Sequence, residues 1–195
     1  GPALAGRVHA LERLHPAPRL RDASTVLAVG VLQCGLQDHQ HPVRGHLAAA
    51  RDLGFHQLQR VECHDLHFIE GQLSQEELQR LALELLSDPV TQNIVWDELP
   101  APPTPLEPDS VILEVALRPG VTDPVAEQIV RAAHELGFDG VQRAATGLRF
   151  QLEGLQVEQV ERLAKALLVN NVIQHWALGE IAPSFPQETE SSGTV

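Results

Sequence analysis

The sequence is first informative for what it lacks. It has no methionine and no tyrosine, and only two tryptophans and five phenylalanines among 195 residues. Lysine and arginine together number 14 against 26 acidic residues, which gives a net charge of −12. A chain this acidic and this poor in aromatic side chains is a weak candidate for binding nucleic acid or anionic membranes. No apolar run approaches the roughly 18 residues of a membrane-spanning helix, so we expect no membrane segment.

Cysteine is also scarce. Cys34 and Cys63 are too few for a disulfide framework, and no signal-peptide pattern opens the chain, so we expect a cytoplasmic location. Because position 1 is not methionine, we expect a processed chain or a piece of a longer protein. The sequence contains no phosphate-binding loop, dinucleotide fingerprint or nucleophile elbow. We therefore expect no catalytic residues, no bound metal and no cofactor in this chain.

What the sequence does contain is an internal repeat. Leu53-Gly54-Phe55 returns as Leu136-Gly137-Phe138, and further matches follow in the same order at an offset of 82 or 83 residues. They include Leu66-His67-Phe68 with Leu148-Arg149-Phe150, Glu70-Gly71 with Glu153-Gly154, and Leu85-Leu86 with Leu167-Leu168. Two copies at so long a period indicate a duplicated domain rather than a solenoid.

The repeat and the proline content predict the domain boundaries. The tract after the first copy holds five prolines, which stiffen and extend a chain. The last residues are polar and rich in Pro, Ser, Thr and Glu, which is typical of a flexible tail. The predicted segments are a leader (1–24), the first repeat (25–99), a Pro-rich linker (100–109), the second repeat (110–182) and a flexible tail (183–195).

Each copy reads as a βαββαβ unit, and the second copy shows this most clearly. Apolar residues alternate over 111–117, which predicts a strand. A Pro-Gly turn follows, and Asp123 is a good N-cap for a helix that begins at Pro124 and ends at Gly137. A short strand near Val141 comes next.

A second strand around 148–152, a second helix and a last strand starting near Val172 complete the unit. In the first copy, Ser74 and Glu77 form a predicted capping box at the start of the second helix.

This order of elements indicates an α+β fold made of two tandem ferredoxin-like βαββαβ units. In the segment 26–32 both faces of the predicted strand are apolar, which implies burial on both sides. We therefore expect the two sheets to pack against each other as a covalent, internal pseudo-dimer. A unit of about 75 residues is marginal alone, so this docking would also stabilise each copy.

Histidines crowd the first copy and raise the question of a metal site. They are His39, His41, His46, His64 and His67, with Cys63 among them. Their spacing matches no standard zinc pattern, and solvent-exposed histidines at helix entries are the simpler interpretation. Neither cysteine has a base placed beside it by the sequence, so nucleophilic catalysis is weakly indicated.

The segment from Leu117 to Pro124, followed by Leu136-Gly137-Phe138 and Thr146-Gly147, carries a family resemblance. These motifs resemble the PurS family, the small non-catalytic subunits of phosphoribosylformylglycinamidine synthase, and the resemblance covers about residues 111–178. The first copy has Gly35-Leu36-Gln37-Asp38 at the matching place and lacks the Pro-Gly and Asp-Pro pairs. It therefore looks like a degenerate half.

The resemblance implies a scaffold in de novo purine biosynthesis that links a glutaminase to an ATP-dependent synthetase and helps pass ammonia between them. ATP and Mg²⁺ are then expected on the partner synthetase. Around the strand glycine the family usually has Arg and Lys where this chain has Ala145 and Leu148. The partner-contact residues that the resemblance implies are Arg118, Pro119, Gly120, Asp123, Pro124, Gly147 and Arg149.

Two other functions stay open at this point. Tandem ACT-like regulatory modules share the βαββαβ order and often have a Pro-Gly pair after the first strand, and they bind an amino acid at their interface. A self-standing metal enzyme built on the His and Cys residues is the third class.

Overall fold

The computed structural model describes residues 25–33, 42–86, 92–98 and 110–185. The predicted leader and linker lie outside the described residues, as do Cys34, His39 and His41. The first half contains β1 (Thr25–Gln33), α1 (Pro42–Asp52), β2 (Arg60–Gly71), α2 (Gln75–Leu81), the π-helix η1 (Ala82–Leu86) and β3 (Gln92–Glu98). The second half contains β4 (Ser110–Leu117), α3 (Pro124–Glu135), β5 (Val141–Glu153), α4 (Val157–Leu163), η2 (Ala164–Leu168) and β6 (Gln174–Leu178).

The strands form one antiparallel sheet of six in the order β3-β1-β2-β5-β4-β6. The α+β class is confirmed, but the stacking of two sheets face to face is wrong. The halves instead meet edge to edge, because β2 pairs with β5 from Arg60↔Glu153 to Gly71↔Val141. Each of these strands would otherwise present an unpaired row of backbone groups at a sheet edge, and their pairing satisfies both rows.

The two short middle strands that we expected in each half are a single long strand. β2 has 12 residues and β5 has 13. Thr146 and Gly147, which fall between the two expected strands, lie inside β5 and pair with His67 and Leu66 of β2. A strand this long is possible because the partner strand of the other half runs beside it along its whole length.

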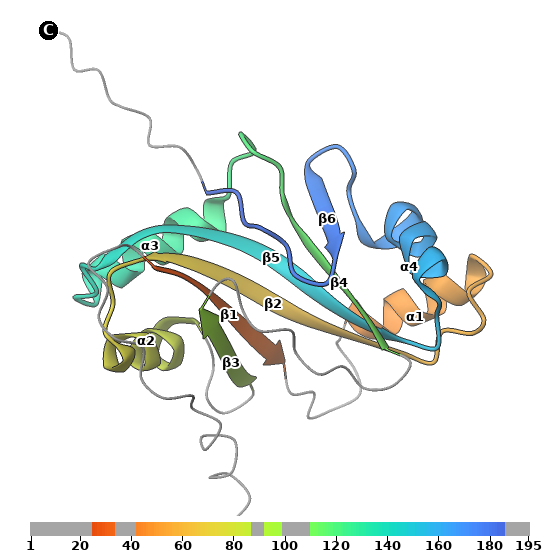
Figure 1. Ribbon diagram of the computed structural model, residues 1–195, viewed down its shortest axis with the longest axis horizontal. Coiled ribbons are helices and arrows are strands. Elements are labelled where there is room, and N and C mark those ends of the chain that lie inside the picture. Colours follow the sequence, from red (N-terminus) through yellow and green to blue (C-terminus); the bar gives the residue numbers. More distant parts are fainter. Residues whose placement is uncertain (1–24, 34–41, 87–91, 99–109, 186–195) are drawn as a thin grey trace, which may run out of the picture.

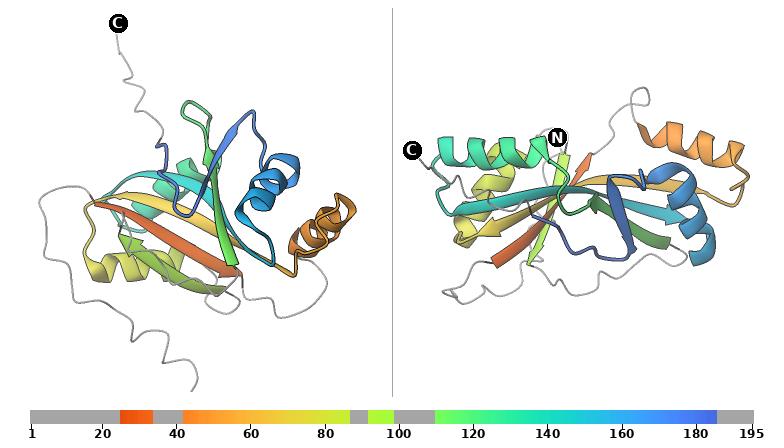
Figure 2. Two further views of the ribbon diagram at one scale, coloured as in Figure 1. Left: turned by 45° about the vertical axis from the view of Figure 1, so that its right-hand side comes forward. Right: turned by 90° about the horizontal axis from the view of Figure 1, so that it is seen from above.

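In the described part of the chain, the α-helices lie on one face of the sheet, in two groups at opposite ends of the long strands (Figure 1; Figure 2). α1 lies beside α4 and η2 at one end, whereas α2 and η1 lie beside α3 at the other. Each group combines helices from both halves of the chain. The packing that buries them is therefore shared between the halves.

Three apolar clusters follow from this arrangement. The α1–α4 core includes Ala50, Phe55, Val61, Leu113, Phe150, Leu152 and Leu163. The α2–α3 core includes Ile69, Leu81, Ile129, Ala133, Phe138 and Ala144. The open-face cluster, on the sheet face opposite the helices, consists of Leu66, Phe68, Ala116, Ala145 and Ile181, with Ala177 and Phe185 packed against it.

The helix ends follow the local sequence closely. Asp123 caps α3 and Pro124 is its first residue, as expected, and Gly137 follows the helix with a positive φ. The capping box of α2 is confirmed, because Ser74 Oγ accepts from Glu77 N and Glu77 Oε2 accepts from Ser74 N. The last strand begins at Gln174 rather than near Val172, since residues 171–173 form a turn.

One of the sequence matches between the copies is out of structural register. Phe68 belongs to the open-face cluster, whereas Phe150, its match at an offset of 82, lies in the α1–α4 core on the helical face. Side chains alternate between faces along a strand, so a shift of one residue moves them to the other side. Residues that share the helical face are 83 apart, such as Ile69 and Leu152.

Within the described part of the chain, no helix is both long and apolar enough to span a lipid bilayer.

Candidate partner-contact surface

The turn after β4 has the conformation that its Pro-Gly pair predicts. Val121 N donates to Arg118 O at 3.1 Å, which closes a four-residue turn with Pro119 and Gly120 at its centre. Gly120 has a φ of +83°, the conformation that the third residue of a type II turn requires. Arg118, Pro119 and Gly120 are all exposed. These three predicted contact residues therefore lie at the surface.

Asp123 has a different position, because its side chain is only 5% exposed. Its Oδ1 accepts from Ala126 N at 2.9 Å, which caps α3. Its Oδ2 accepts from Thr146 N at 2.8 Å and from Thr146 Oγ1 at 2.9 Å. β4 pairs with β5 only as far as Ala116↔Gly147. At the next residue of β5, Thr146, the backbone N–H donates to the Asp123 carboxylate and not to β4. Asp123 thus ties the turn and α3 to the sheet, while Pro124 beside it is exposed.

Gly147 lies in the middle of β5 and not between two strands, which is where the expected strands near Val141 and around 148–152 would have placed it. A Cβ at Gly147 would lie 2.7 Å from Val115 O and 3.2 Å from the Phe68 ring. The close approach of β4 and of Phe68 therefore requires glycine here. The Thr-Gly pair suggested an interruption of the strand, because glycine is rare inside strands.

Arg149 is engaged inside the molecule. Its Nε donates to Glu114 Oε1 at 2.6 Å, across the β4–β5 pair. Glu114 is only 2% exposed, and its Oε2 accepts from Ile181 N at 2.7 Å. A buried carboxylate is tolerated when it is paired and hydrogen-bonded in this way. The sequence pattern does not point to Glu114, because a polar residue between apolar ones in an alternating strand is expected to face solvent.

The structure adds a second turn to the surface around Arg118. The turn from Asn170 to Ile173, between η2 and β6, lies beside it, because Arg118 N donates to Ile173 O at 2.9 Å. The Arg118 guanidinium also donates to Asn171 O, at 3.2 Å. We call residues 118–120 and 170–173 together the paired turns. Only the fold brings these two segments together, since 50 residues separate them.

The second of the paired turns is held rigidly and presents an apolar side chain. Val172 N donates to Asn170 Oδ1 at 3.1 Å, Asn170 N donates to Gln174 Oε1 at 2.8 Å, and Gln174 N donates to Asn170 O at 2.8 Å. The Val172 side chain is nevertheless 82% exposed. An ordered turn that holds an apolar side chain in solvent is a feature of docking surfaces, because little entropy is lost on binding.

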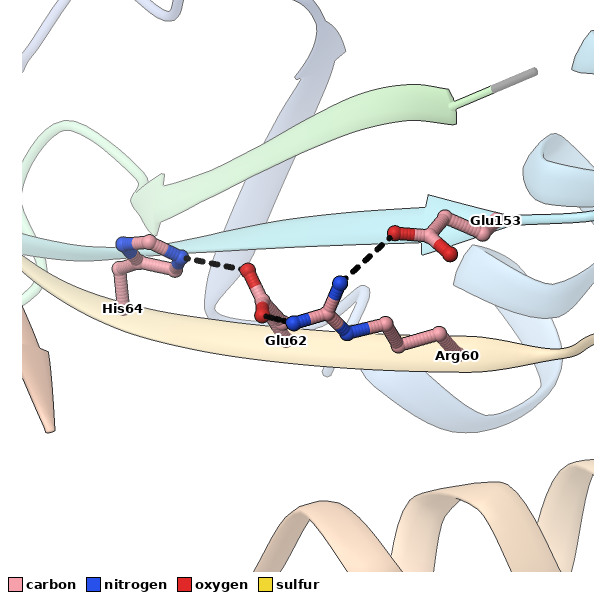
Figure 3. A network of polar contacts seen from close by, with 4 residues as sticks. All are labelled: Arg60, Glu62, His64 and Glu153. Atoms are coloured by element: carbon pink, nitrogen blue, oxygen red, sulfur yellow. Dashed lines mark hydrogen bonds and ion pairs between the residues drawn. The ribbon is translucent and has the colours of Figure 1, made fainter. Parts of the chain in front are cut away.

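The first half contributes a polar network on the open face of the sheet (Figure 3). Arg60 pairs with Glu62, and its Nη1 donates to Glu153 Oε1 at 3.3 Å across the β2–β5 pair. His64 Nε2 lies 3.7 Å from Glu62 Oε2. Burial lowers the pKa of His64 although Glu62 opposes that shift. These contacts join the halves, but they are partly exposed and contribute little to stability each.

The other described His and Cys residues of the first half do not converge on one point. Among the residues that the structure describes, no group of three or more His, Cys, Asp and Glu side chains is arranged to hold a metal ion. Burial raises the pKa of Cys63 to about 11, so its thiol is protonated at neutral pH and is a poor nucleophile. Burial also lowers the pKa of His67, against the nearby charges of Asp65 and Asp123.

The fold and this surface define an α+β protein whose second half offers rigid turns at the end of a helix-covered antiparallel sheet. A family model described as PurS, phosphoribosylformylglycinamidine (FGAM) synthase, matches residues 110–179. A curated relative, phosphoribosylformylglycinamidine synthase subunit PurS of Mycobacterium leprae, is 31% identical over 70 residues. That alignment covers 34% of this chain and 89% of the relative. The chain belongs to the PurS family.

The family match favours PurS over ACT-like modules. It falls on the second half, where the sequence motifs were found, and it ends at residue 179, one residue after β6. The contact roles of the seven residues named from the sequence stay predictions. The structure divides them into four exposed residues and three that pack or bind inside the molecule.

Proposed function

We propose that this chain is a non-catalytic bridging component of phosphoribosylformylglycinamidine synthase in purine biosynthesis. It would link the glutaminase and the ATP-dependent synthetase, so that ammonia passes from one to the other. The observation that carries the proposal is the similarity to a named synthase subunit over 89% of that subunit's length. ATP and Mg²⁺ would bind to the synthetase and not to this chain, and the complex would work in the cytoplasm.

The second part of the proposal is that the two halves form a covalent pseudo-dimer of PurS-like units. The element order of the first half returns in the second, including the π-helical turn after the second helix. Phe55 and Phe138 occupy matching positions of the two repeats, but they lie in different cores. Phe55 is in the α1–α4 core and Phe138 is in the α2–α3 core. An exchange of this kind is what a two-fold axis between β2 and β5 would produce.

The proposed contact surface is the paired turns of the second half. Arg118 supplies a positive charge on a strongly acidic chain, and Val172 supplies an exposed apolar group beside it. Such a combination suits a partner surface with an apolar pocket and an acidic rim. The matching segments of the first half, 34–41 and 87–91, lie outside the described residues, but the first lacks the Pro-Gly and Asp-Pro pairs. The second half would therefore make the main contact.

Asp123 and Gly147 support this surface from within. By binding both Ala126 N and Thr146 N, Asp123 holds the turn at a set distance from the sheet. Gly147 lets β4 and β5 approach closely just before the turn. A bridging protein performs no chemistry, so its contribution is to hold its partners in a constant relative position.

The direct experiment combines the chain with the matching synthetase and glutaminase and measures product formation with glutamine or with ammonium as the nitrogen source. We expect glutamine-dependent turnover to need the chain and ammonium-dependent turnover to need it less. If neither rate responds and sedimentation detects no complex, the proposed function is wrong.

The contact surface is tested separately with Val172→Asp, which places a charge at an exposed site without changing the turn. We expect at least about tenfold more chain to be needed for half-maximal glutamine-dependent turnover, as for a contact at the centre of an interface. The matched control is Leu53→Asp, because Leu53 is 53% exposed and lies in the other half. Equal behaviour of both variants, with a working wild-type chain, would place the contact elsewhere.

A further inference from the structure

β6 forms one edge of the sheet, and its outer side is open. It stands last in the strand order β3-β1-β2-β5-β4-β6 and, within the described part of the chain, pairs with β4 alone (Figure 1). Two backbone bonds flank this pairing: Arg118 N donates to Ile173 O, and Gly179 N donates to Ile112 O. Bonded positions alternate along an antiparallel pair, so the odd-numbered residues of β6 are the ones whose backbone groups face β4.

The even-numbered residues of β6 therefore direct their backbone groups away from the sheet. Gln174 already uses its N–H, which donates to Asn170 O at 2.8 Å. Trp176 and Leu178 have no such partner among the residues that the structure describes. Their N–H and C=O groups form a short row to which an added strand could bond.

β6 lacks the devices that usually keep an exposed edge from pairing with another chain. Its sequence, Gln174–Leu178, contains no Lys, Arg, Asp, Glu or Pro, and its register with β4 has no bulge. The strand at the other edge, β3, ends in Asp97 and Glu98. Charges, prolines and bulges are what protect sheet edges in proteins. β6 is therefore the edge that a partner would extend.

Two cations lie beside this edge without a partner of opposite charge. Arg118 and Lys165 are exposed, and none of the ion pairs between described residues includes either of them. Lys165 Nζ lies 5.7 Å from the centre of the Trp176 ring, and the Arg118 guanidinium donates to Asn171 O in the turn that leads into β6. The whole chain carries a net charge of −12, so the sign of the charge is reversed locally at this edge.

We propose that a partner protein contributes an extended segment with acidic side chains, which adds to the sheet as a strand beside β6. The inference rests on the proposed function and deepens it, because the partner is a component of the same complex. The main chain of the segment would bond to Trp176 and Leu178, and its carboxylates would pair with Arg118 and Lys165. The paired turns end where β6 begins, so the added strand would continue the contact made by Val172.

The same charges disfavour a second copy of this chain as the added strand. Two β6 strands paired about a two-fold axis would bring the Lys165 side chains of both copies, each held beside its own Trp176, close together, and like charges repel. Pairing of β6 with β3 of another copy would be head-to-tail and would continue from copy to copy without closing. Light scattering of the isolated chain would detect either arrangement. A mass that rises with concentration would overturn the proposal.

The main test is hydrogen exchange of single amides, measured for the chain alone and for its complex with the matching synthetase and glutaminase. We expect the Trp176 and Leu178 amides to exchange at least about tenfold more slowly in the complex, because an added strand accepts from them. If the complex forms and makes product while both amides exchange as fast as before, this inference is wrong and the proposed function stands. If no complex forms, the proposed function is wrong and this inference falls with it.

A proline substitution tests the backbone contact directly. Leu178→Pro removes an N–H that faces away from the sheet, a position at which edge strands tolerate proline. Leu178→Ala is the matched control, because it shortens the same side chain and keeps the N–H. We expect half-maximal glutamine-dependent turnover to need at least about tenfold more of the proline variant than of the alanine variant. Equal amounts of two folded variants would contradict the proposal, and if the proline variant does not fold, the exchange measurement decides.

The acidic character of the added segment is tested by reversing one charge. Lys165→Glu should raise the amount of chain needed for half-maximal turnover by at least about fivefold, because a carboxylate of the partner would then meet a like charge. Arg131→Glu makes the same change at an exposed arginine of α3 and should behave as the wild-type chain. Equal behaviour of the two variants would show that the added segment is not acidic and would overturn the proposal.

Discussion

At the scale of single residues, Asp123 shows how much one buried carboxylate can organise. The sequence identifies it as a helix cap, which accounts for its bond to Ala126 N. The structure adds Thr146, whose backbone N and hydroxyl both donate to the other oxygen. The partner-contact role that the family resemblance implied for Asp123 would therefore be indirect, through the turn that it holds in place.

Replacement of Asp123 should be more damaging than the loss of an ordinary cap. We expect Asp123→Ala to lower the free energy of unfolding by about 2 to 3 kcal/mol, since about 1 kcal/mol is typical of a cap and Thr146 N also loses its partner. Urea denaturation followed by circular dichroism measures this loss. Thr122→Ala, at the exposed neighbouring residue, should change stability by less than about 0.5 kcal/mol. Equal effects of the two variants would show that the bonds to Thr146 contribute nothing.

At the scale of elements, β5 is the strand on which the molecule is built. It contributes Phe150 and Leu152 to the α1–α4 core, Ala144 to the α2–α3 core, and Ala145 to the open-face cluster. β4 lies along one edge and β2 along the other. β5 can contribute side chains to the clusters on both faces of the sheet because Gly147, at its midpoint, leaves room for the Phe68 ring and for β4.

Two glycine substitutions should therefore have opposite effects. Gly147→Ala should lower the free energy of unfolding by about 1 to 3 kcal/mol, because the new methyl group meets Val115 O, a backbone atom that cannot move alone. Gly45→Ala, inside α1 with no atom within 4 Å of its added methyl group, should raise it by about 0.5 to 1 kcal/mol. Urea midpoints of both variants test the pair. A stable Gly147→Ala chain would show that the strands can separate at no cost.

At the scale of the whole molecule, the halves are joined by their cores as well as by the β2–β5 pair. α1 of the first half shares a core with α4 of the second, and α2 of the first half shares one with α3 of the second. Neither half keeps its hydrophobic contacts without the other. We therefore infer that the two halves fold as one unit.

This sharing predicts a single unfolding transition. In a Trp96→Phe chain, the fluorescence of Trp176 in the second half should follow the same urea curve as the circular dichroism of the whole chain. Phe138→Ala, in the α2–α3 core, should shift both curves together by about 3 to 5 kcal/mol, although Trp176 packs against the α1–α4 core.

The control for this experiment is Leu136→Ser, two residues away and exposed, which should leave both curves within about 0.5 kcal/mol of the parent chain. Two separate transitions, or a Phe138→Ala effect confined to the circular dichroism signal, would show that the halves unfold independently.

Much of the local structure could be read from the sequence, because it depends on neighbouring residues. The start of α3 at Pro124, its end before Gly137, the turn at Pro119-Gly120 and the capping box at Ser74 all follow from backbone preferences. The family resemblance was found from the same segments. The contact between the paired turns could not be found in this way, because Arg118 and Ile173 meet only when β6 pairs with β4.

By itself, the sequence determined the α+β class, the order of the helices and the family of the second half, because periodicity, caps and turns act over a few residues. The tertiary structure decided how the halves join, and it did so through pairing and burial over long range. Long strands that satisfy each other's backbone edges form one sheet, so the described strands of the two halves lie side by side and are not stacked. Among the described residues, Ile181 and Phe185 pack on the open face of that sheet, and their positions depend on Glu114, Arg149 and Phe68, far away in the sequence.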